Sequence, residues 1–320
     1  MRYRETAEQE QLPDRKLPDR RRFLKWGSAA TLAGGVTALA AACTVGSSAS
    51  STGSGSQRES GFDRWKRTGT ARIAIDLTFP PISFKDSSNK PAGYAVDLLN
   101  RMAADFGVAI DYIETPFAQQ IAAVEAGKAD MQQSATILPS RALQGLFADV
   151  PIIYESNIVI LKPGSTITDA SQLNNANVTL AVQQGTSEEY STKILFPKAK
   201  FVVLAQVGDL ANEVATQRAD AAVLNEFNIP SIKTAHPDVK LLPVPLWVDA
   251  DSFFMPLGDY KLKEWVSNWV RYQAAHGTLA ALWNKWVGDD VRGKYGFASA
   301  VVGSSGQAIS IDANGKQTVL

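Results

Sequence analysis

The sequence predicts an α/β protein built from two similar lobes. The chain has 320 residues, of which 45% are hydrophobic and 20% charged, which allows two globular domains with substantial cores. Strand, helix, strand, helix and strand patterns follow one another between residues 72 and 133, the order typical of a parallel sheet covered by helices. The same alternation returns between residues 178 and 224, which predicts a second lobe of the same kind.

Apolar spacing and helix-ending residues delimit the elements of the first half. Strands are predicted over 72–76, 110–114 and 129–133, with a short helical turn over 62–67 before the first of them. Apolar residues from Val96 to Phe106 recur at spacings near three and four, which indicates an amphipathic helix with Gly107 as its C-cap. A second helix opens at Pro116 and ends at Gly127.

The second half repeats these signals and adds a helical C-terminal region. Strands are predicted over 157–162, 178–183, 201–205, 221–224 and 252–257. One helix is predicted to begin near residue 185, and another to run through residues 210 and 214. The region 260–287 is Trp-rich, and its aromatic and apolar side chains fall at helical spacing, which favours burial in the core. They are Trp265, Trp269 and Tyr272 on one face and Leu279, Leu282, Trp283 and Trp286 on another. In the tail over 291–320, whose role is not indicated, Asn314-Gly315 predicts a hairpin.

Composition excludes several classes of function. Lys+Arg and Asp+Glu are both 32, so the chain has no basic field for nucleic acid. Cys43 is the one cysteine, which excludes an internal disulfide and a thiolate metal cluster. The two histidines, His236 and His276, are both predicted in loops or at helix ends rather than in a catalytic or metal site. The common hydrolase and nucleotide motifs are missing, so no cofactor and no metal are predicted.

The N-terminus has the pattern of an export signal. Arg20-Arg21 followed by Phe23-Leu24-Lys25 resembles a twin-arginine signal, and a weakly apolar run over 26–42 comes next. Ala40-Ala41-Ala42-Cys43 resembles a bacterial lipoprotein processing site, which predicts a lipid anchor at Cys43 after a signal peptide over 1–43. The alternative is plain secretion, with cleavage nearby and an incidental cysteine. The Ser/Gly-rich segment over 44–61 is typical of a flexible linker.

Side chains suited to a carboxylate gather after the third strand. Ser134 and Thr136 are two positions apart, so their hydroxyls can face the same way. Pro139 ends the strand, and Arg141 falls in the next turn, where its guanidinium can grip a carboxylate through two hydrogen bonds. The alternative is an ordinary surface salt bridge. Because ligands of parallel sheets lie at the carboxyl ends of the strands, the loop from Asp76 to Phe79 and the ring of Phe117 belong to the same edge.

Gly185-Thr186-Ser187 marks a second candidate anion site in the other lobe. The segment offers backbone N–H groups and hydroxyls at the predicted start of a helix, where the helix dipole favours negative charge. The alternative is ordinary N-capping of that helix by Thr186 or Ser187.

Taken together, these segments resemble the bacterial extracellular solute-binding proteins of family 3, the receptors of polar amino-acid ABC importers. The similarity runs from about residue 62 to residue 287. It is carried by segments 72–76, 79–81, 93–98, 126–130, 134–141, 184–187 and 218–223. The resemblance implies the type II periplasmic-binding-protein fold, in which two strands cross between two α/β lobes, here near 155–162 and 249–257. It places lobe 1 over 62–157, lobe 2 over 158–251 and a return to lobe 1 over 252–290.

The resemblance also assigns roles in the cleft between the lobes. Arg141 would hold the α-carboxylate of an amino acid, assisted by Ser134, Thr136 and the start of the helix at Thr186-Ser187. Phe79 would cover the ligand side chain, and Phe117 would line the opposite wall. The implied partners are a small-molecule ligand and an ABC permease, and the implied location is outside the cytoplasm, on the membrane or in the periplasm.

Asn225 departs from the family pattern, which has an aspartate there to accept the α-ammonium of the ligand. An amide oxygen accepts a hydrogen bond but supplies no charge, so a buried ammonium is less well compensated. Either Glu226 or another carboxylate such as Asp76 takes over, or the ligand lacks a free α-ammonium. Leu138, where the family often has threonine, is a second departure. The sequence therefore predicts a small carboxylate-bearing solute, of which an amino acid is one form.

Two other functions compete with this prediction. The chain also resembles the cyclohexadienyl dehydratases, which have this fold, in residues 185–188 and 236–239. Their chemistry needs a general acid, and the aligned position holds Asn228, with Glu226 two residues away. A binding protein is therefore predicted rather than an enzyme. A sensor or structural lipoprotein without a transporter would have the same sequence features.

Overall fold

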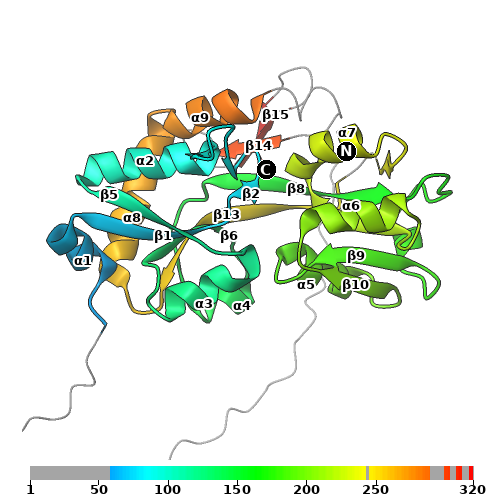
Figure 1. Ribbon diagram of the computed structural model, residues 1–320, viewed down its shortest axis with the longest axis horizontal. Coiled ribbons are helices and arrows are strands. Elements are labelled where there is room, and N and C mark those ends of the chain that lie inside the picture. Colours follow the sequence, from blue (N-terminus) through cyan, green and yellow to red (C-terminus); the bar gives the residue numbers. More distant parts are fainter. Residues whose placement is uncertain (1–57, 243–244, 289–298, 303–307, 312–316, 320) are drawn as a thin grey trace, which may run out of the picture. The chain divides into compact units, whose positions relative to one another are not determined.

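The computed structural model describes residues 58–242 and 245–288, together with the backbone of three short strands at 299–302, 308–311 and 317–319 (Figure 1). The predicted signal peptide with Arg20-Arg21, the lipidation site Cys43 and the linker up to residue 57 lie outside the described residues. Within the described part, no helix is both long enough and apolar enough to span a bilayer.

Lobe 1 begins with helix α1 (Gly61–Thr68) and a parallel sheet of three strands. Strand β1 (Thr70–Ile75) lies between β5 (Ala109–Glu114) and β6 (Met131–Thr136), with Ile73 opposite both Tyr112 and Met131. The predicted strands and helices are confirmed, except that β6 extends to Thr136, so both hydroxyls lie within the strand rather than after it. Helix α2 (Tyr94–Phe106) ends at Gly107 in the left-handed conformation, as predicted.

Helices cover both faces of this sheet. Ile73 and Ile75 pack with α2 on one face, whereas Ala74 packs with Val124 of α3 (Gln120–Glu125) on the other (Figure 1). Strands β2 (Thr78–Phe79), β3 (Ser83–Lys85) and β4 (Pro91–Ala92) form a small separate sheet after β1. Gly93 follows this sheet at φ 122°, where a Cβ would lie 2.4 Å from a backbone oxygen, so only glycine fits there. The short elements η2 (Phe117–Gln119), α4 (Pro139–Ala142) and β7 (Gly145–Phe147) complete the lobe.

Lobe 2 repeats the architecture. Strand β9 (Thr179–Gln183) pairs in parallel with β10 (Lys200–Leu204) and β11 (Ala221–Asn225), as the second alternation predicted. Side chains that alternate along these strands divide into two apolar clusters, one with Leu210 and Ile229, the other with Phe196. The remaining elements are η3 (Ala170–Leu173), α5 (Ser187–Leu195), α6 (Val207–Ala215), η4 (Glu226–Asn228), α7 (Ile229–Ala235) and β12 (Lys240–Leu241).

Two strands cross between the lobes and join their sheets. Strand β8 (Ile153–Leu161) pairs antiparallel with β11 of lobe 2 and with β13 (Trp247–Pro256), and β13 in turn pairs with β6 of lobe 1. The resulting order is β10-β9-β11-β8-β13-β6-β1-β5 (Figure 1). The fold is therefore the two-lobe arrangement that the resemblance implied, with both crossings near the expected residues.

The C-terminal helices α8 (Tyr260–Ala275) and α9 (Thr278–Trp286) return to lobe 1. Trp265, Trp269 and Trp283 pack against its apolar core, as predicted for the Trp-rich region. The prediction was wrong for Tyr272, which is 57% exposed and stacks on His276 instead. Both histidines follow helix ends, as predicted.

The described part of the tail is a small antiparallel sheet. Strands β14 (Ser299–Val302), β15 (Ala308–Ile311) and β16 (Gln317–Val319) pair in that order. Ile309 lies opposite Val319, which confirms the pairing of the predicted hairpin. Asn314-Gly315, the residues of its turn, lie outside the described residues.

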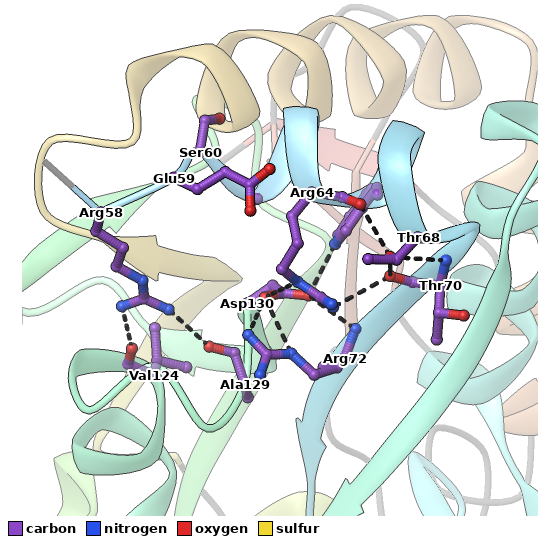
Figure 2. A network of polar contacts seen from close by, with 12 residues as sticks. Arg58, Glu59, Ser60, Arg64, Thr68, Thr70, Arg72, Val124, Ala129 and Asp130 are labelled. Carbon is purple, nitrogen blue, oxygen red and sulfur yellow. Dashed lines mark hydrogen bonds and ion pairs between the residues drawn. The ribbon is translucent and has the colours of Figure 1, made fainter. Parts of the chain in front are cut away.

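Asp130 ties helix α1 to the sheet of lobe 1 (Figure 2). Its carboxylate accepts hydrogen bonds from the guanidinium groups of Arg64 and Arg72, from the Trp65 indole and from the Arg72 amide. Burial alone would raise the pKa of Asp130, but these donors hold it below its usual value. The Arg58 guanidinium donates nearby to the carbonyls of Val124 and Ala129. Segment 126–130, which carries part of the family resemblance, therefore has a structural role here.

Candidate functional site

A cleft of about 660 Å³, part of it open to solvent, lies between the lobes. Lobe 1 lines it with Asp76, Thr78, Phe79, Phe117, Gln133, Ser134 and Thr136. Lobe 2 lines it with Gln183, Thr186, Ser187, Glu188, Gln206, Val207, Asn225 and Asn228, and the crossing strands add Glu155 and Asp251. The cleft thus brings together eight of the nine side chains that the sequence predicted for the site, the exception being Arg141.

Asp76 organises the lobe 1 side of the cleft. One carboxylate oxygen accepts from the amide and the hydroxyl of Thr78, at 3.0 and 2.6 Å, and the other accepts from the amide of Phe117 at 3.1 Å. The carboxylate therefore shapes the loop after β1 and positions Phe117. Phe79 packs edge-on against Phe227 of η4, with ring centroids 5.9 Å apart.

Ser134 and Thr136 of β6 are both buried at the cleft. The Thr136 hydroxyl donates to the Ser187 hydroxyl at 3.3 Å, and the Ser187 hydroxyl donates to Glu188 at 3.1 Å. A hydrogen-bonded chain therefore connects the lobe 1 strand with the first turn of α5 in lobe 2.

Arg141 is not among the described residues that line the cleft, but it lines a second pocket that shares Thr186 with it. Its side chain is 6% exposed and donates to the carbonyl of Thr136 at 3.1 Å and to the carbonyl of Gly185 at 2.9 Å. The guanidinium carbon is 5.5 Å from the centroid of the Phe117 ring. Burial lowers the pKa of Arg141, and the nearby carboxylates of Asp251 and Glu188 oppose that shift. The alternative of a surface salt bridge is wrong, because Arg141 is buried and joins the two lobes.

The start of α5 is engaged in its own capping. The Thr186 hydroxyl accepts from the amide of Glu189 and donates to the carbonyl of Gln183, as the N-cap alternative predicted. The amide of Gly185 donates to the Glu189 carboxylate at 2.7 Å. These groups are therefore occupied, which weakens the predicted anion site at this helix start.

Asn225, Glu226 and Asn228 differ in whether they line the cleft. The Asn225 side-chain oxygen accepts from the Asn228 amide at 2.7 Å, so part of its capacity is used. Glu226, the expected substitute acid, is fully buried, accepts from the backbone amide of Ser156 and is not among the described residues that line the cleft. Asn228, aligned with the acid of the dehydratases, does line it.

Sequence reasoning missed three buried acids of the cleft: Glu155, Glu188 and Asp251. Burial, followed by the charges of the neighbouring acids, raises the pKa of Glu155 well above its usual value. Burial and the charge of Asp249 raise the pKa of Asp251 to about 7. Burial likewise raises the pKa of Glu188, although hydrogen bonds to its charged form oppose the shift. The available signal was that Asp and Glu are depleted in strands, yet both crossing segments contain them.

Comparisons with known proteins agree on one family. Residues 71–289 match the profile of the bacterial extracellular solute-binding proteins, family 3. A cyclohexadienyl dehydratase of Pseudomonas aeruginosa is 19% identical over 233 residues, which cover 72% of this chain and 87% of that protein. The lysine/arginine/ornithine-binding periplasmic protein of Escherichia coli is 28% identical over 159 residues, which are 49% of this chain and 61% of that protein.

A solved structure supports the same relationship. It is the crystal structure of an ancestral amino acid-binding protein described as a precursor of cyclohexadienyl dehydratase. The two chains are 29% identical and superpose with a TM-score of 0.64, over 71% of this chain and 99% of that one.

Proposed function

The chain belongs to the bacterial extracellular solute-binding proteins of family 3, and we propose that it is a receptor that captures a small, positively charged solute for an ABC importer. One observation supports the positive charge proposed for the solute. Of the described residues that line the cleft, four are carboxylic acids, Asp76, Glu155, Glu188 and Asp251, and none is Lys, Arg or His.

The physical reason is electrostatic. Carboxylates buried together repel one another and lose hydration, and this is why the pKa values of Glu155 and Asp251 are raised. A bound cation offsets both effects, whereas an anion adds to them. The lysine/arginine/ornithine-binding relative supports the same class of ligand. Cationic amino acids are therefore the first candidates. Asn225 supplies no charge for the α-ammonium of such a ligand, and in this proposal carboxylates of the cleft accept it instead.

The remaining site residues fit an amphipathic solute. Phe79 and Phe117 offer apolar walls for a hydrocarbon chain, and the Ser134 hydroxyl offers a donor for a carboxylate, whereas the Thr136 and Ser187 hydroxyls already donate within the protein. Arg141 remains the proposed partner of that carboxylate, since a guanidinium has five N–H donors and two of its bonds here go to carbonyl oxygens.

A thermal-shift screen of the purified protein tests the proposal. We expect L-arginine, L-lysine or L-ornithine to raise the melting temperature, since a ligand at 100 times its Kd adds about 2.7 kcal/mol, roughly 5–10 °C for a domain of this size. The matched controls are L-citrulline and L-norleucine, which keep the backbone groups and lack the side-chain charge. Stabilisation by organic acids or neutral amino acids alone would contradict the proposal.

The proposed location is the outer face of the membrane, with Cys43 carrying the lipid anchor and the segment over 44–61 acting as a tether. Cys43→Ser should then move the protein from the membrane fraction to the soluble fraction. An unchanged distribution would favour an anchor elsewhere, or export without lipid.

Dehydratase activity is the second candidate, and Glu155 is the observation that favours it. A carboxyl whose pKa is raised well above its usual value keeps its proton to a higher pH than an ordinary glutamate and can donate it to a departing hydroxyl. Glu155 lines the cleft, whereas Glu226 does not. Prephenate and arogenate are the substrates to test. Turnover by the wild-type protein that is lost in Glu155→Gln would establish the enzyme. Absence of turnover by the wild-type protein would favour the receptor function.

A further inference from the structure

Two polar side chains of the cleft have atoms that lack a partner. The Gln133 side-chain oxygen and the Asp251 Oδ1 are buried and accept no hydrogen bond. The Gln133 amide nitrogen donates to the Ser83 hydroxyl at 2.8 Å, so the orientation of this side chain is set and its oxygen is left over. Both residues are almost fully buried, at 2% and 6% exposed, and both line the cleft. A buried acceptor without a donor is costly, which points to a ligand that supplies one.

Asp251 is one of three acidic residues on the two crossing strands, with Asp249 and Glu155. In the antiparallel pair of β8 and β13, Asp249 lies opposite Glu155, and Asp251 is the diagonal neighbour of Glu155. Asp249 is already satisfied, since its carboxylate accepts from the Asn157 amide at 2.8 Å and from the Trp247 indole at 2.9 Å. Asp249 is also not among the described residues that line the cleft. Glu155 and Asp251 are the acids of these strands that meet the cleft.

We infer that Asp251, with Glu155 beside it, forms the subsite for the positively charged group of the solute, and that the Gln133 oxygen accepts a further N–H from it. The inference rests on the proposed function and deepens it, because it names the residues that select a cation. The charged group meant here is that of the solute's side chain, which the neutral counterparts lack, and not its α-ammonium.

The arrangement would place the bound cation between the two lobes. Gln133 belongs to lobe 1, Glu188 belongs to lobe 2, and Glu155 and Asp251 lie on the strands between them. A cation bound among them would lie between residues of both lobes and of the crossing strands.

Isothermal titration of Asp251→Asn tests the assignment, with Asp249→Asn as the matched control on the same strand. The probe is whichever of L-arginine, L-lysine and L-ornithine binds the wild-type protein most tightly, compared with L-citrulline or L-norleucine as its neutral counterpart. A hydrogen bond to a charged group corresponds to a factor of about 10–150 in Kd. We expect a loss of that size for the cationic probe in Asp251→Asn and less than about threefold in Asp249→Asn.

The neutral counterpart separates charge selection from misfolding. Its affinity should be unchanged in Asp251→Asn, and the melting temperature of that variant without ligand should not fall, since a repelled buried charge is removed. If the cationic probe binds Asp251→Asn as well as wild type, the subsite assignment is overturned and the proposed function stands. If no cationic amino acid binds the wild-type protein while a neutral or anionic solute does, both are overturned.

Discussion

At the residue scale, Arg141 illustrates how a residue type can be predicted while its partners cannot. The sequence places a guanidinium next to two hydroxyls, and the fold then buries it against the carbonyls of Thr136 and Gly185. The charges of Asp251, Glu188 and Glu155, three acids of the cleft, act on its guanidinium. Arg141 therefore combines two roles, the structural one of joining the lobes and the proposed one of binding a carboxylate.

Arg141→Ala should weaken the binding of any carboxylate-bearing solute by several kcal/mol, because charge-assisted hydrogen bonds contribute about 1.5–3 kcal/mol each. Titration calorimetry with the ligand found in the screen measures the loss. Arg141→Lys is the control, since it keeps the charge and removes the planar fork. An affinity that is unchanged in Arg141→Ala would remove Arg141 from the site.

Asp251 predicts how the stability of the ligand-free protein depends on pH. Its pKa is about 7 in the folded protein, against about 3.9 in an unfolded chain. The folded state therefore binds more protons between these values, and the stability that this group contributes is present below about pH 4 and lost as the pH rises through 7. The acids Asp249, Glu155 and Glu188 and the Arg141 guanidinium are the charges that act on it.

Melting temperatures of the ligand-free protein between pH 5 and pH 8 check this sign. We expect the wild-type protein to lose stability toward pH 8 and Asp251→Asn to lose less. Equal slopes for the two proteins would mean that Asp251 does not titrate in this range.

At the element scale, periodicity and capping residues were sufficient to predict most of the fold. The spacing from Val96 to Phe106 and the glycine after it defined α2, and alternation defined the strands of both lobes. Strand ends were less predictable, since β6 continues through Thr136 by pairing with β13, a contact between residues far apart in sequence. The acids of β8 and β13 were missed for the same reason. Which side chains of a crossing strand meet the cleft depends on pairing rather than on local pattern.

Asp130 is the residue whose loss should disturb an element most. Asp130→Asn leaves Arg64 and Arg72 without their carboxylate, and breaking a buried ion pair typically costs about 3–5 kcal/mol. Urea denaturation with and without ligand measures this loss. Because Asp130 does not line the cleft, ligand affinity should remain that of the wild-type protein. A stability within about 1 kcal/mol of wild type would show that the network in Figure 2 contributes little.

At the scale of the whole molecule, the two lobes share one continuous sheet, and the strands that connect them place the acidic side chains of Glu155 and Asp251 in the cleft. Thr136 and Arg141 contact lobe 2 at Ser187 and Gly185, so the lobes meet at these points. A cation would add contacts to the acids between these points. The central claim is therefore that the cleft selects a solute by its positive charge.

Isothermal titration of the wild-type protein at pH 7, in two buffers of different ionisation enthalpy, tests this claim most directly. L-arginine, L-lysine and L-ornithine are compared with L-citrulline and L-norleucine. We predict that at least one cationic amino acid binds at least tenfold more tightly than its neutral counterpart, and that it releases protons from the raised-pKa acids as it binds. Neutral counterparts that bind equally well, without proton release, would contradict the claim.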